Sequence, residues 1–256
     1  MMKRKATFLT YEKPFLTAMV QEKTPEDAIC VIMDSLYDGA DAFGIQLCNL
    51  LPEYRNVETL RKIFSYCEGK PIYITSYRGH QSKGLSDEEC AELLLMGLDA
   101  GATLCDVMGD FFCPEPDQLT FDPVAVEKQK ELIAKIHEKG GEVLISTHTS
   151  RYFTEEEVLA YARAQIERGT DVVKIVSKAN SEDEQMAALQ IIHRLHRELD
   201  VPFLFLVGGS HTRLVRQIGP ALGCCMYLCL QRYFPVSAKA QPQLRATKAL
   251  RDAMIF

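Results

Sequence analysis

Short apolar runs alternate with longer amphipathic stretches along nearly the whole chain. The short runs are rich in β-branched residues, a pattern typical of strands that are buried on both faces of a parallel sheet. The amphipathic stretches carry apolar residues at the spacing of helices that cover one face of such a sheet. The strands are predicted at residues 15–20, 42–47, 71–77, 103–107, 142–147, 171–176, 202–206 and 223–230.

The helices predicted between these strands have recognisable ends. Thr24, Ser86 and Thr154 each place a hydroxyl group at a helix start, with acidic residues in the first turn. Glycines follow several of the stretches, at the position where a left-handed residue commonly ends a helix. The clearest helices are predicted at residues 24–38, 86–100, 124–139, 154–168, 181–199 and 241–254.

Eight strands that alternate with helices predict an α/β fold, and eight is the number that closes into a (β/α)8 TIM barrel. The 256 residues match the roughly 250 of one such domain. A doubly wound open sheet is the main competitor, but no GxGxxG turn follows the first strand. We therefore expect a single barrel domain over residues 1–256, with residues 1–13 as an N-terminal extension that would cover the barrel floor.

The composition argues against several classes of protein. With 47% hydrophobic and 25% charged residues the chain can bury a large core, and its net charge of −6 disfavours a general nucleic-acid binder. It has no run of about 18 apolar residues and no signal-peptide core, so we expect a cytoplasmic protein without membrane partners. The nine cysteines form no CxxC pair, which favours reduced core residues over a zinc site.

One lysine occupies a position that is unfavourable for a charge. Lys174 lies within the apolar run 171–176, where the loss of hydration disfavours the ammonium form and should lower its pKa. A neutral amine is a nucleophile that can form a Schiff base with a carbonyl compound. The alternative is a lysine at a strand end whose head reaches water or pairs with a carboxylate.

Other polar residues follow predicted strands, and in a (β/α)8 barrel these strand ends meet at the active site. His148 ends the strand next to that of Lys174, so the two side chains can meet, and an imidazole can take up and return a proton. Arg78 and Arg213 could bind a carboxylate or hydroxyl groups, although a surface ion pair would explain either arginine equally well.

Taken together, these motifs resemble type I 3-dehydroquinate dehydratases, which are (β/α)8 lyases. The resemblance implies a lyase that forms a Schiff base with a small-molecule keto acid, 3-dehydroquinate or a related hydroxy-keto acid, in the shikimate pathway of aromatic amino acid biosynthesis. It implies no metal and no diffusible cofactor, and it makes a homodimer an open expectation. The segments that carry it are Thr75-Ser76-Tyr77-Arg78, Ile145-Ser146-Thr147-His148, Val173-Lys174-Ile175, Ser210-His211-Thr212-Arg213-Leu214 and Ser237-Ala238-Lys239-Ala240-Gln241.

The resemblance also implies a role for each matching residue. Lys174 would form the Schiff base, and His148 would transfer protons during imine formation, proton abstraction and loss of the hydroxyl group. The substrate-binding residues would be Arg213, Ser237 and Gln241 at the carboxylate end and Arg78 at the ring hydroxyl groups.

The chain departs from the family at the ends of the second and third strands. The family has a Glu-x-Arg pair where this chain has Gly44 and Gln46, or Gln46 and Cys48 in a shifted register. It also has a glutamate four residues past the strand-3 arginine, where this chain has Ser82. Gln46 could supply a neutral hydrogen bond in place of the missing charges. Because lost hydroxyl partners change discrimination strongly, we expect altered substrate recognition.

Two alternatives stay open on the sequence alone. One is a class I aldolase-type lyase that uses the same lysine on a phosphorylated ketone, with Gly208-Gly209-Ser210 as the phosphate cradle. The other is a non-catalytic barrel that binds a metabolite or a partner chain. His148, Lys174 and Arg213 together argue against the second alternative, because a scaffold needs no buried amine beside a histidine.

Overall fold

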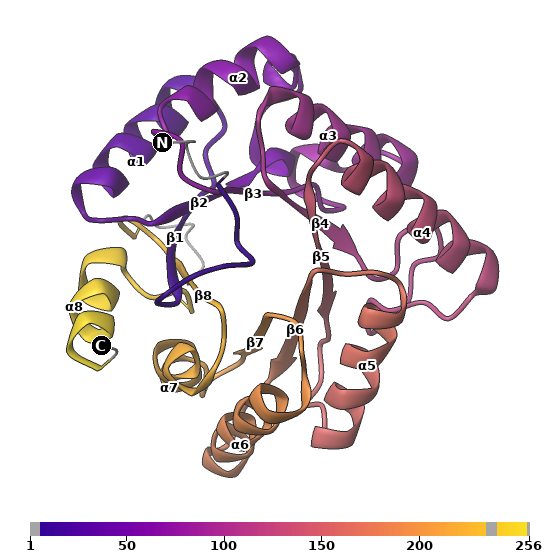
Figure 1. The fold of residues 1–256 in the computed structure, drawn as a ribbon, viewed down its shortest axis with the longest axis vertical. Helices are drawn as coiled ribbons and strands as arrows, with labels where there is room; N and C mark the ends of the chain where they lie inside the picture. Colours follow the sequence, from indigo (N-terminus) through magenta and orange to yellow (C-terminus); the bar gives the residue numbers. More distant parts are fainter. Residues whose placement is uncertain (1–5, 234–239, 255–256) are drawn as a thin grey trace.

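Eight parallel strands surround a common axis and eight helices lie outside them in the computed structural model, which describes residues 6–233 and 240–254 (Figure 1). The strands are β1 (Phe15–Val20), β2 (Ala42–Gln46), β3 (Ile72–Thr75), β4 (Leu104–Met108), β5 (Glu142–His148), β6 (Val172–Lys178), β7 (Phe203–Gly208) and β8 (Met226–Cys229). The helices are α1 (Pro25–Tyr37), α2 (Val57–Ser65), α3 (Asp87–Ala100), α4 (Pro123–Glu138), α5 (Glu155–Glu167), α6 (Glu182–Glu198), α7 (Arg213–Ile218) and α8 (Leu244–Met254).

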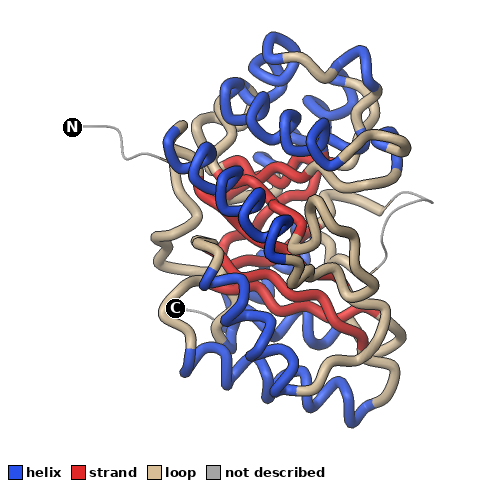
Figure 2. Tube along the Cα trace, turned by 90° about the vertical axis from the view of Figure 1, so that its right-hand side faces the viewer, coloured by secondary structure: helices blue, strands red, loops and turns tan. Residues whose placement is uncertain are grey.

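The sheet closes on itself. Its hydrogen-bonded order runs from β7 down to β1 and then to β8, so each strand pairs with its neighbour in sequence and β1 also pairs with β8. The gap between β7 and β8 is bridged by the Cys225 amide, which donates to the Phe203 carbonyl oxygen at 2.9 Å. Figure 2 shows the strands enclosed by helices. The predicted (β/α)8 barrel is therefore confirmed, while the assignment of one domain to the whole chain stays a prediction.

Local sequence signals account for most of the helix ends. The side chains of Ser86 and Thr154 each accept a hydrogen bond from the backbone amide three residues on, as expected from the acidic residues that follow. Their own backbone amides donate to the side chains of Glu89 and Glu157, which completes a capping box at each helix start. Gly101 ends α3 in the left-handed conformation, with φ of 115°. The short helices α2 and α7 were not among those predicted, because nine and six residues carry too little periodicity to stand out.

The interior of the barrel changes from apolar to polar along the strands. Alternate residues of a strand share a face. The inward-pointing residues near the starts of β4, β5 and β6 are apolar, namely Leu104, Leu144 and Val172, and the residue two positions later on each strand is polar. All three apolar side chains are fully buried. The polar residues that follow them are Asp106, Ser146 and Lys174, which form a polar layer above an apolar plug.

The segment before β1 covers the end of the barrel where the strands begin. Phe8 is fully buried, and its amide donates a 2.9 Å hydrogen bond to the carboxylate of Glu142, the first residue of β5. Thr7 donates to the same carboxylate. In Figure 1 this part of the chain crosses the barrel opening before it enters β1. The described part of the extension, residues 6–14, therefore lies at the barrel floor, opposite the strand ends that carry chemistry.

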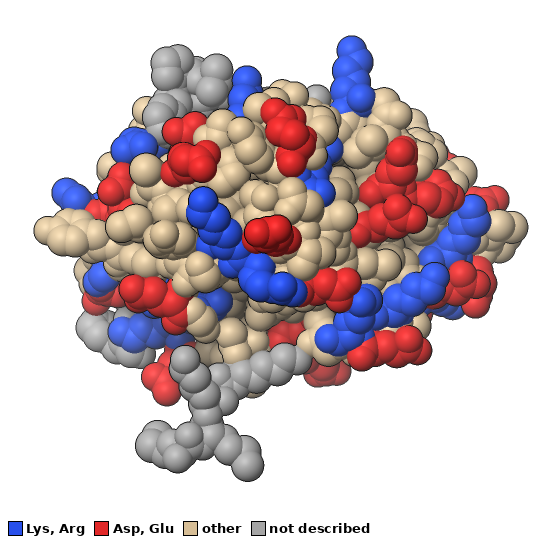
Figure 3. All heavy atoms as spheres, turned by 90° about the horizontal axis from the view of Figure 1, so that it is seen from above, with Lys and Arg blue, Asp and Glu red and all other residues tan. Residues whose placement is uncertain are grey.

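The outer surface shows no single-sign field on the face in Figure 3, where acidic and basic side chains are interspersed. No helix in the described ranges is long and apolar enough to cross a membrane. All nine cysteines lie within those ranges and none of them forms a disulfide there; seven are buried, as expected of core residues.

Candidate active site

Lys174 lies at the centre of the polar layer in the barrel. It points inward from β6 and is 3% exposed, which confirms that the lysine is buried. Its Nζ donates to Asp106 Oδ2 at 3.0 Å, to the Tyr77 hydroxyl at 2.7 Å and to the Tyr73 hydroxyl at 2.9 Å. An ammonium group has three N–H donors, so every one of them is used. Burial lowers the pKa of Lys174, and the Asp106 carboxylate opposes that effect.

Asp106 is the charged partner of this lysine and is fully buried on β4. Its Oδ2 also accepts hydrogen bonds from Tyr73 and Tyr77, and its Oδ1 accepts one from Ser146 at 2.5 Å. Burial alone would raise the pKa of Asp106, but the Lys174 ammonium and the three hydroxyl donors bring it below the ordinary value. The carboxyl group is therefore ionised, and it forms an ion pair with Lys174 inside the barrel.

His148 ends β5, on the mouth side of Ser146. Its Nδ1 lies 2.9 Å from the side-chain oxygen Oε1 of Gln118. Since that oxygen can only accept, the arrangement assigns the imidazole proton to Nδ1 and leaves a lone pair on Nε2. Burial, followed by the charge of Lys174, lowers the pKa of His148 to about 3. The imidazole is therefore neutral at pH 7, beside the ion pair.

Arg216 belongs to this site although it is not among the predicted site residues. It lies on α7, where its Nε donates to the Val207 carbonyl oxygen at 3.1 Å and to the Thr212 hydroxyl at 2.9 Å. Burial lowers the pKa of Arg216 to about 10, and its positive charge contributes to the lowered pKa values of Lys174 and His148. Within the described residues, no hydrogen bond reaches its two terminal amino groups. This guanidinium is therefore anchored at one edge and available for an anion at the other.

Arg213 is placed differently from Arg216 on the same short helix. It is the first residue of α7 and is exposed. The phase of the helix decides which arginine faces the barrel, and a six-residue helix gives no periodic signal from which to read that phase. The predicted site residue Arg213 is thus not brought next to Lys174, whereas Arg216, three residues on, is near enough to affect its pKa.

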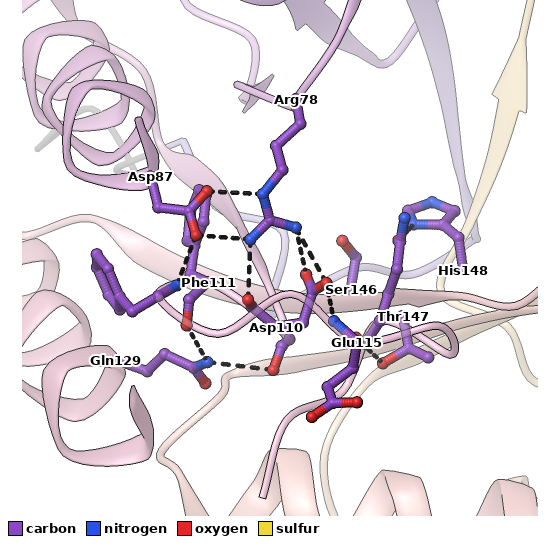
Figure 4. A network of polar contacts seen from close by, with 12 residues as sticks. Arg78, Asp87, Asp110, Phe111, Glu115, Gln129, Ser146, Thr147 and His148 are labelled. Carbon is purple, nitrogen blue, oxygen red and sulfur yellow. Dashed lines mark hydrogen bonds and ion pairs between the residues drawn. The ribbon is translucent and has the colours of Figure 1, made fainter. Parts of the chain in front are cut away.

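Arg78 is held by two carboxylates. Its Nε and one amino group pair with Asp87 at 2.7 and 2.6 Å, and the other amino group pairs with both carboxylate oxygens of Asp110 at 2.9 and 3.0 Å. The Asp110 carbonyl oxygen accepts a further bond. Figure 4 shows the guanidinium between the two acids, with His148 apart from them. All five N–H donors are engaged, so a substrate hydroxyl would have to displace an existing partner.

Two further predicted residues, Gln46 at the end of β2 and Gln241 after β8, lie at the mouth end of the barrel. Gln46 ends β2, and its Oε1 accepts a 3.2 Å hydrogen bond from Asn49. Gln241 is buried before α8, and its side-chain oxygen has no hydrogen-bond partner among the described residues. Ser237 lies outside the described residues.

The β1–β2 side of the interior is filled by apolar atoms. A Cβ atom on Gly44 would lie 2.3 Å from Met19 Sδ and 3.1 Å from a ring carbon of Tyr73, so the inward face of Gly44 is already occupied. Neither Gly44 nor Gln46 brings a charge to this wall, as the departure from the family pattern predicts.

The glycine run after β7 has a local structural reason. A Cβ atom on Gly209 would lie 2.6 Å from the Ala179 carbonyl oxygen, and its φ of 96° is in the left-handed region. The Ser210 amide donates to the Asn180 side-chain oxygen at 3.4 Å. Close packing of the β6–α6 and β7–α7 connections thus accounts for these glycines. No finding favours the aldolase-type alternative.

These features define a (β/α)8 barrel enzyme built around a buried lysine–aspartate pair at the carboxyl ends of its strands. The model of the type I 3-dehydroquinase family matches residues 18–254. The chain belongs to this family and is accordingly a lyase of the dehydratase type.

Solved structures agree with this fold. The 3-dehydroquinate dehydratase of Geobacillus kaustophilus superposes with a TM-score of 0.81 at 16% identity, covering 96% of this chain and 92% of the other. The type I enzyme of Clostridium difficile, crystallised with covalently modified comenic acid, gives 0.80 at 20% identity and covers 98% of both chains. The Enterococcus faecalis enzyme gives 0.77 at 15% identity, over 98% and 99% of the two chains. No curated protein matches the sequence.

Proposed function

We propose that this protein dehydrates 3-dehydroquinate, or a closely related hydroxy-keto acid, through a Schiff base at Lys174. The observation that carries the proposal is the placement of the Lys174 amine, buried at the strand ends with an ionised Asp106 and a neutral His148 close by. A desolvated amine with a proton acceptor beside it is suited to attack a ketone. Family membership supports the same reaction class.

The proposed reaction has two stages. The ketone and the Lys174 ammonium condense to an iminium ion and one water molecule. The iminium acidifies the neighbouring C–H bond, His148 accepts that proton on Nε2, and the electron pair expels the β-hydroxyl group, which leaves as water with a proton returned from the imidazolium. Hydrolysis of the conjugated iminium consumes one water molecule and restores Lys174, so the net change is loss of one water molecule.

The carboxylate of the substrate is proposed to bind Arg216 together with Gln241 and Ser237. Arg216 has two amino groups that no described residue engages and lies near enough to Lys174 to affect its pKa, and a guanidinium binds a carboxylate through paired hydrogen bonds. An incoming carboxylate would also offset the positive charge that lowers the pKa of His148, which strengthens the base at the moment it is needed. Arg213, exposed on the same helix, would act only at the rim.

Borohydride trapping tests the proposal directly. The protein is incubated with 3-dehydroquinate and borohydride, the mass of the Lys174 peptide is measured, and enone absorbance is followed without the reductant. We expect an adduct on Lys174 and an enone product. Lys174→Met should remove both, while Lys128→Met, at an exposed lysine, should keep both.

Three results would change the assignment. Absence of any adduct with 3-dehydroquinate and with related hydroxy-keto acids would refute the Schiff base. An adduct without enone would exclude 3-dehydroquinate as the substrate. A stronger adduct with sugar phosphates would favour the aldolase-type reaction instead.

The proposal extends to the setting of the enzyme. The activity belongs to the shikimate pathway, and we propose a cytoplasmic location and a homodimer, for which family membership is the support. Light scattering on the purified protein measures the oligomeric state, and a monomeric mass would remove the homodimer.

A further inference from the structure

Two tyrosines share the Lys174–Asp106 pair, and they approach it from different sides. Tyr73 belongs to β3, is 1% exposed and reaches the pair from inside the barrel. Tyr77 follows the end of β3 on the mouth side and is only partly buried. The two hydroxyl oxygens lie 3.5 Å apart. Both phenols accept from Lys174 Nζ and donate to Asp106 Oδ2, so they have the same partners and differ in access to the mouth.

Tyr77 is the phenol that can also meet a substrate. Its ring stands edge-on to the His148 imidazole, with centroids 5.4 Å apart and planes at 80°. Its hydroxyl lies 2.7 Å from Lys174 Nζ and 2.5 Å from Asp106 Oδ2. A ketone carbon within bonding distance of Nζ would therefore have its oxygen close to this hydroxyl, whereas Tyr73 lies beneath the amine.

We propose that Tyr77 is a further catalytic residue, which passes protons between Lys174 Nζ and the carbonyl oxygen during imine formation, with Asp106 holding each proton in between. This inference rests on the proposed Schiff base. It divides the work of the site: Tyr77 and Asp106 serve formation of the imine, and His148 serves the later abstraction and elimination.

The proton count of this step closes without another reactant. An ammonium and a ketone give an iminium and water with the charge unchanged, so two N–H protons must move to the ketone oxygen. The first passes from Nζ to Asp106, and the freed electron pair forms the C–N bond while the carbonyl π pair moves to oxygen. That oxygen takes the proton back through Tyr77. The second proton follows the same route, and water leaves as the nitrogen lone pair forms the C=N bond.

His148 is less suited to this first stage. Its Nδ1 is occupied by Gln118, and no hydrogen bond joins its ring to Lys174 or Asp106 in the described residues. Asp106, in contrast, already contacts both the amine and the phenol.

The matched pair of phenols provides the test. Tyr77→Phe and Tyr73→Phe each remove one hydroxyl that contacts both Lys174 and Asp106, but only Tyr77 can reach the ketone. The rate at which the Lys174 adduct appears under borohydride is measured with 3-dehydroquinate and, independently of the natural substrate, with glyoxylate. We expect Tyr77→Phe to slow trapping at least tenfold and Tyr73→Phe to slow it less than threefold, with little change in the half-saturating ligand concentration.

A second variant guards against a misfolded protein. Tyr77→Gln keeps a hydrogen-bonding side chain but cannot exchange a proton as a phenol does, so it should be as slow as Tyr77→Phe. Asp106→Asn combined with Tyr77→Phe should be no slower than the slower single variant, because the two groups act in one route.

Each outcome decides the matter. Equal slowing by the two phenylalanine variants would mean that the phenols only adjust the charge on Lys174, and it would overturn the relay. Unchanged trapping in Tyr77→Phe or Tyr77→Gln would overturn it too, while leaving the Schiff base intact. Absence of trapping in the unaltered protein with either carbonyl compound would overturn both the relay and the proposed function.

Discussion

The two sides of the barrel mouth differ sharply in chemistry. Strands β3 to β6 contribute a continuous set of groups that hold and move protons, centred on Lys174 and Asp106. Strands β1 and β2 contribute Met19 and Gly44, which are packed so closely that a single added carbon at Gly44 would collide with the methionine sulfur. One side is therefore built to react with a carbonyl group, and the other presents little that could recognise a hydroxyl group.

In this family member, the side of the mouth suited to react with the substrate is distinct from the side on which relatives would recognise its hydroxyl groups. A buried ion pair is expensive to desolvate, so its presence on the β3–β6 side is explained more readily by chemistry than by stability. The β1–β2 side follows ordinary core packing, and Arg78, at the border between the two, is neutralised by Asp87 and Asp110. We infer that substrate specificity differs from that of relatives with a charged wall, while the reacting end of the substrate is the same.

The largest expected effect concerns the acid stability of the reactive side. The pKa of His148 is about 3 in the fold because burial and then Lys174 disfavour its charge, against 6.5 in a solvated chain. Between these values the unfolded chain binds a proton that the folded chain excludes, so stability is full above pH 6.5 and falls as the pH drops toward 3. At about 1.36 kcal/mol per pH unit, this loss approaches about 5 kcal/mol.

Replacement of His148 should reduce this loss of stability at low pH. His148→Asn is expected to lose several kcal/mol less than the unaltered protein between pH 6.5 and 4 in urea denaturation, whereas His193→Asn, at an exposed histidine, should leave the profile unchanged. If both variants followed the unaltered profile, the imidazole would not be neutral and desolvated, and the contrast between the two sides would weaken.

The second largest effect tests whether the reactive side of the barrel mouth includes α7. Arg216→Met should raise the KM for a keto acid about tenfold to a hundredfold, because a charge-assisted hydrogen bond to a carboxylate contributes about 1.5–3 kcal/mol. Arg213→Met, three residues earlier and exposed, should change KM less than twofold. Steady-state kinetics of the two variants give the comparison. A larger KM effect at Arg213 would restore the assignment made from the sequence and show that the loop after β7 rearranges on binding.

The sequence predicts the fold well because the periodicity of hydrophobic residues and the helix caps are local properties. The strand at 15–20 coincides with β1, and the Ser86 and Thr154 caps lie where the acidic first turns indicate. Lys174 stands out for the same local reason, since a charge interrupts an apolar run. Asp106 gives an identical signal inside the run 103–107, and the positions of the two residues on parallel strands are enough to predict that they pair.

The rest of the site depends on relations that sequence spacing does not contain. Arg78 is engaged by Asp87, the first residue of α3, and by Asp110 after β4, and the fold alone brings these carboxylates to it. β3 leaves the ladder after Thr75, two residues before the predicted end of the strand, and Tyr77 in the following connection still turns inward to Lys174. A predicted strand to residue 77 places this phenol on the inward face by simple alternation, but it does not show that the hydroxyl group reaches the Lys174 amine.

The smallest effect tests the apolar side. Gly44→Ala adds one carbon against Met19 Sδ and the Tyr73 ring, and overpacking of this kind costs about 1–3 kcal/mol. Met19→Ala removes the obstructing atoms. Gly44→Ala should therefore lower the free energy of unfolding less in the Met19→Ala protein than in the unaltered protein. Urea denaturation of the four proteins measures this coupling. If the effects simply added, the wall would have free space, and a polar substrate group could be accommodated beside Gly44 after all.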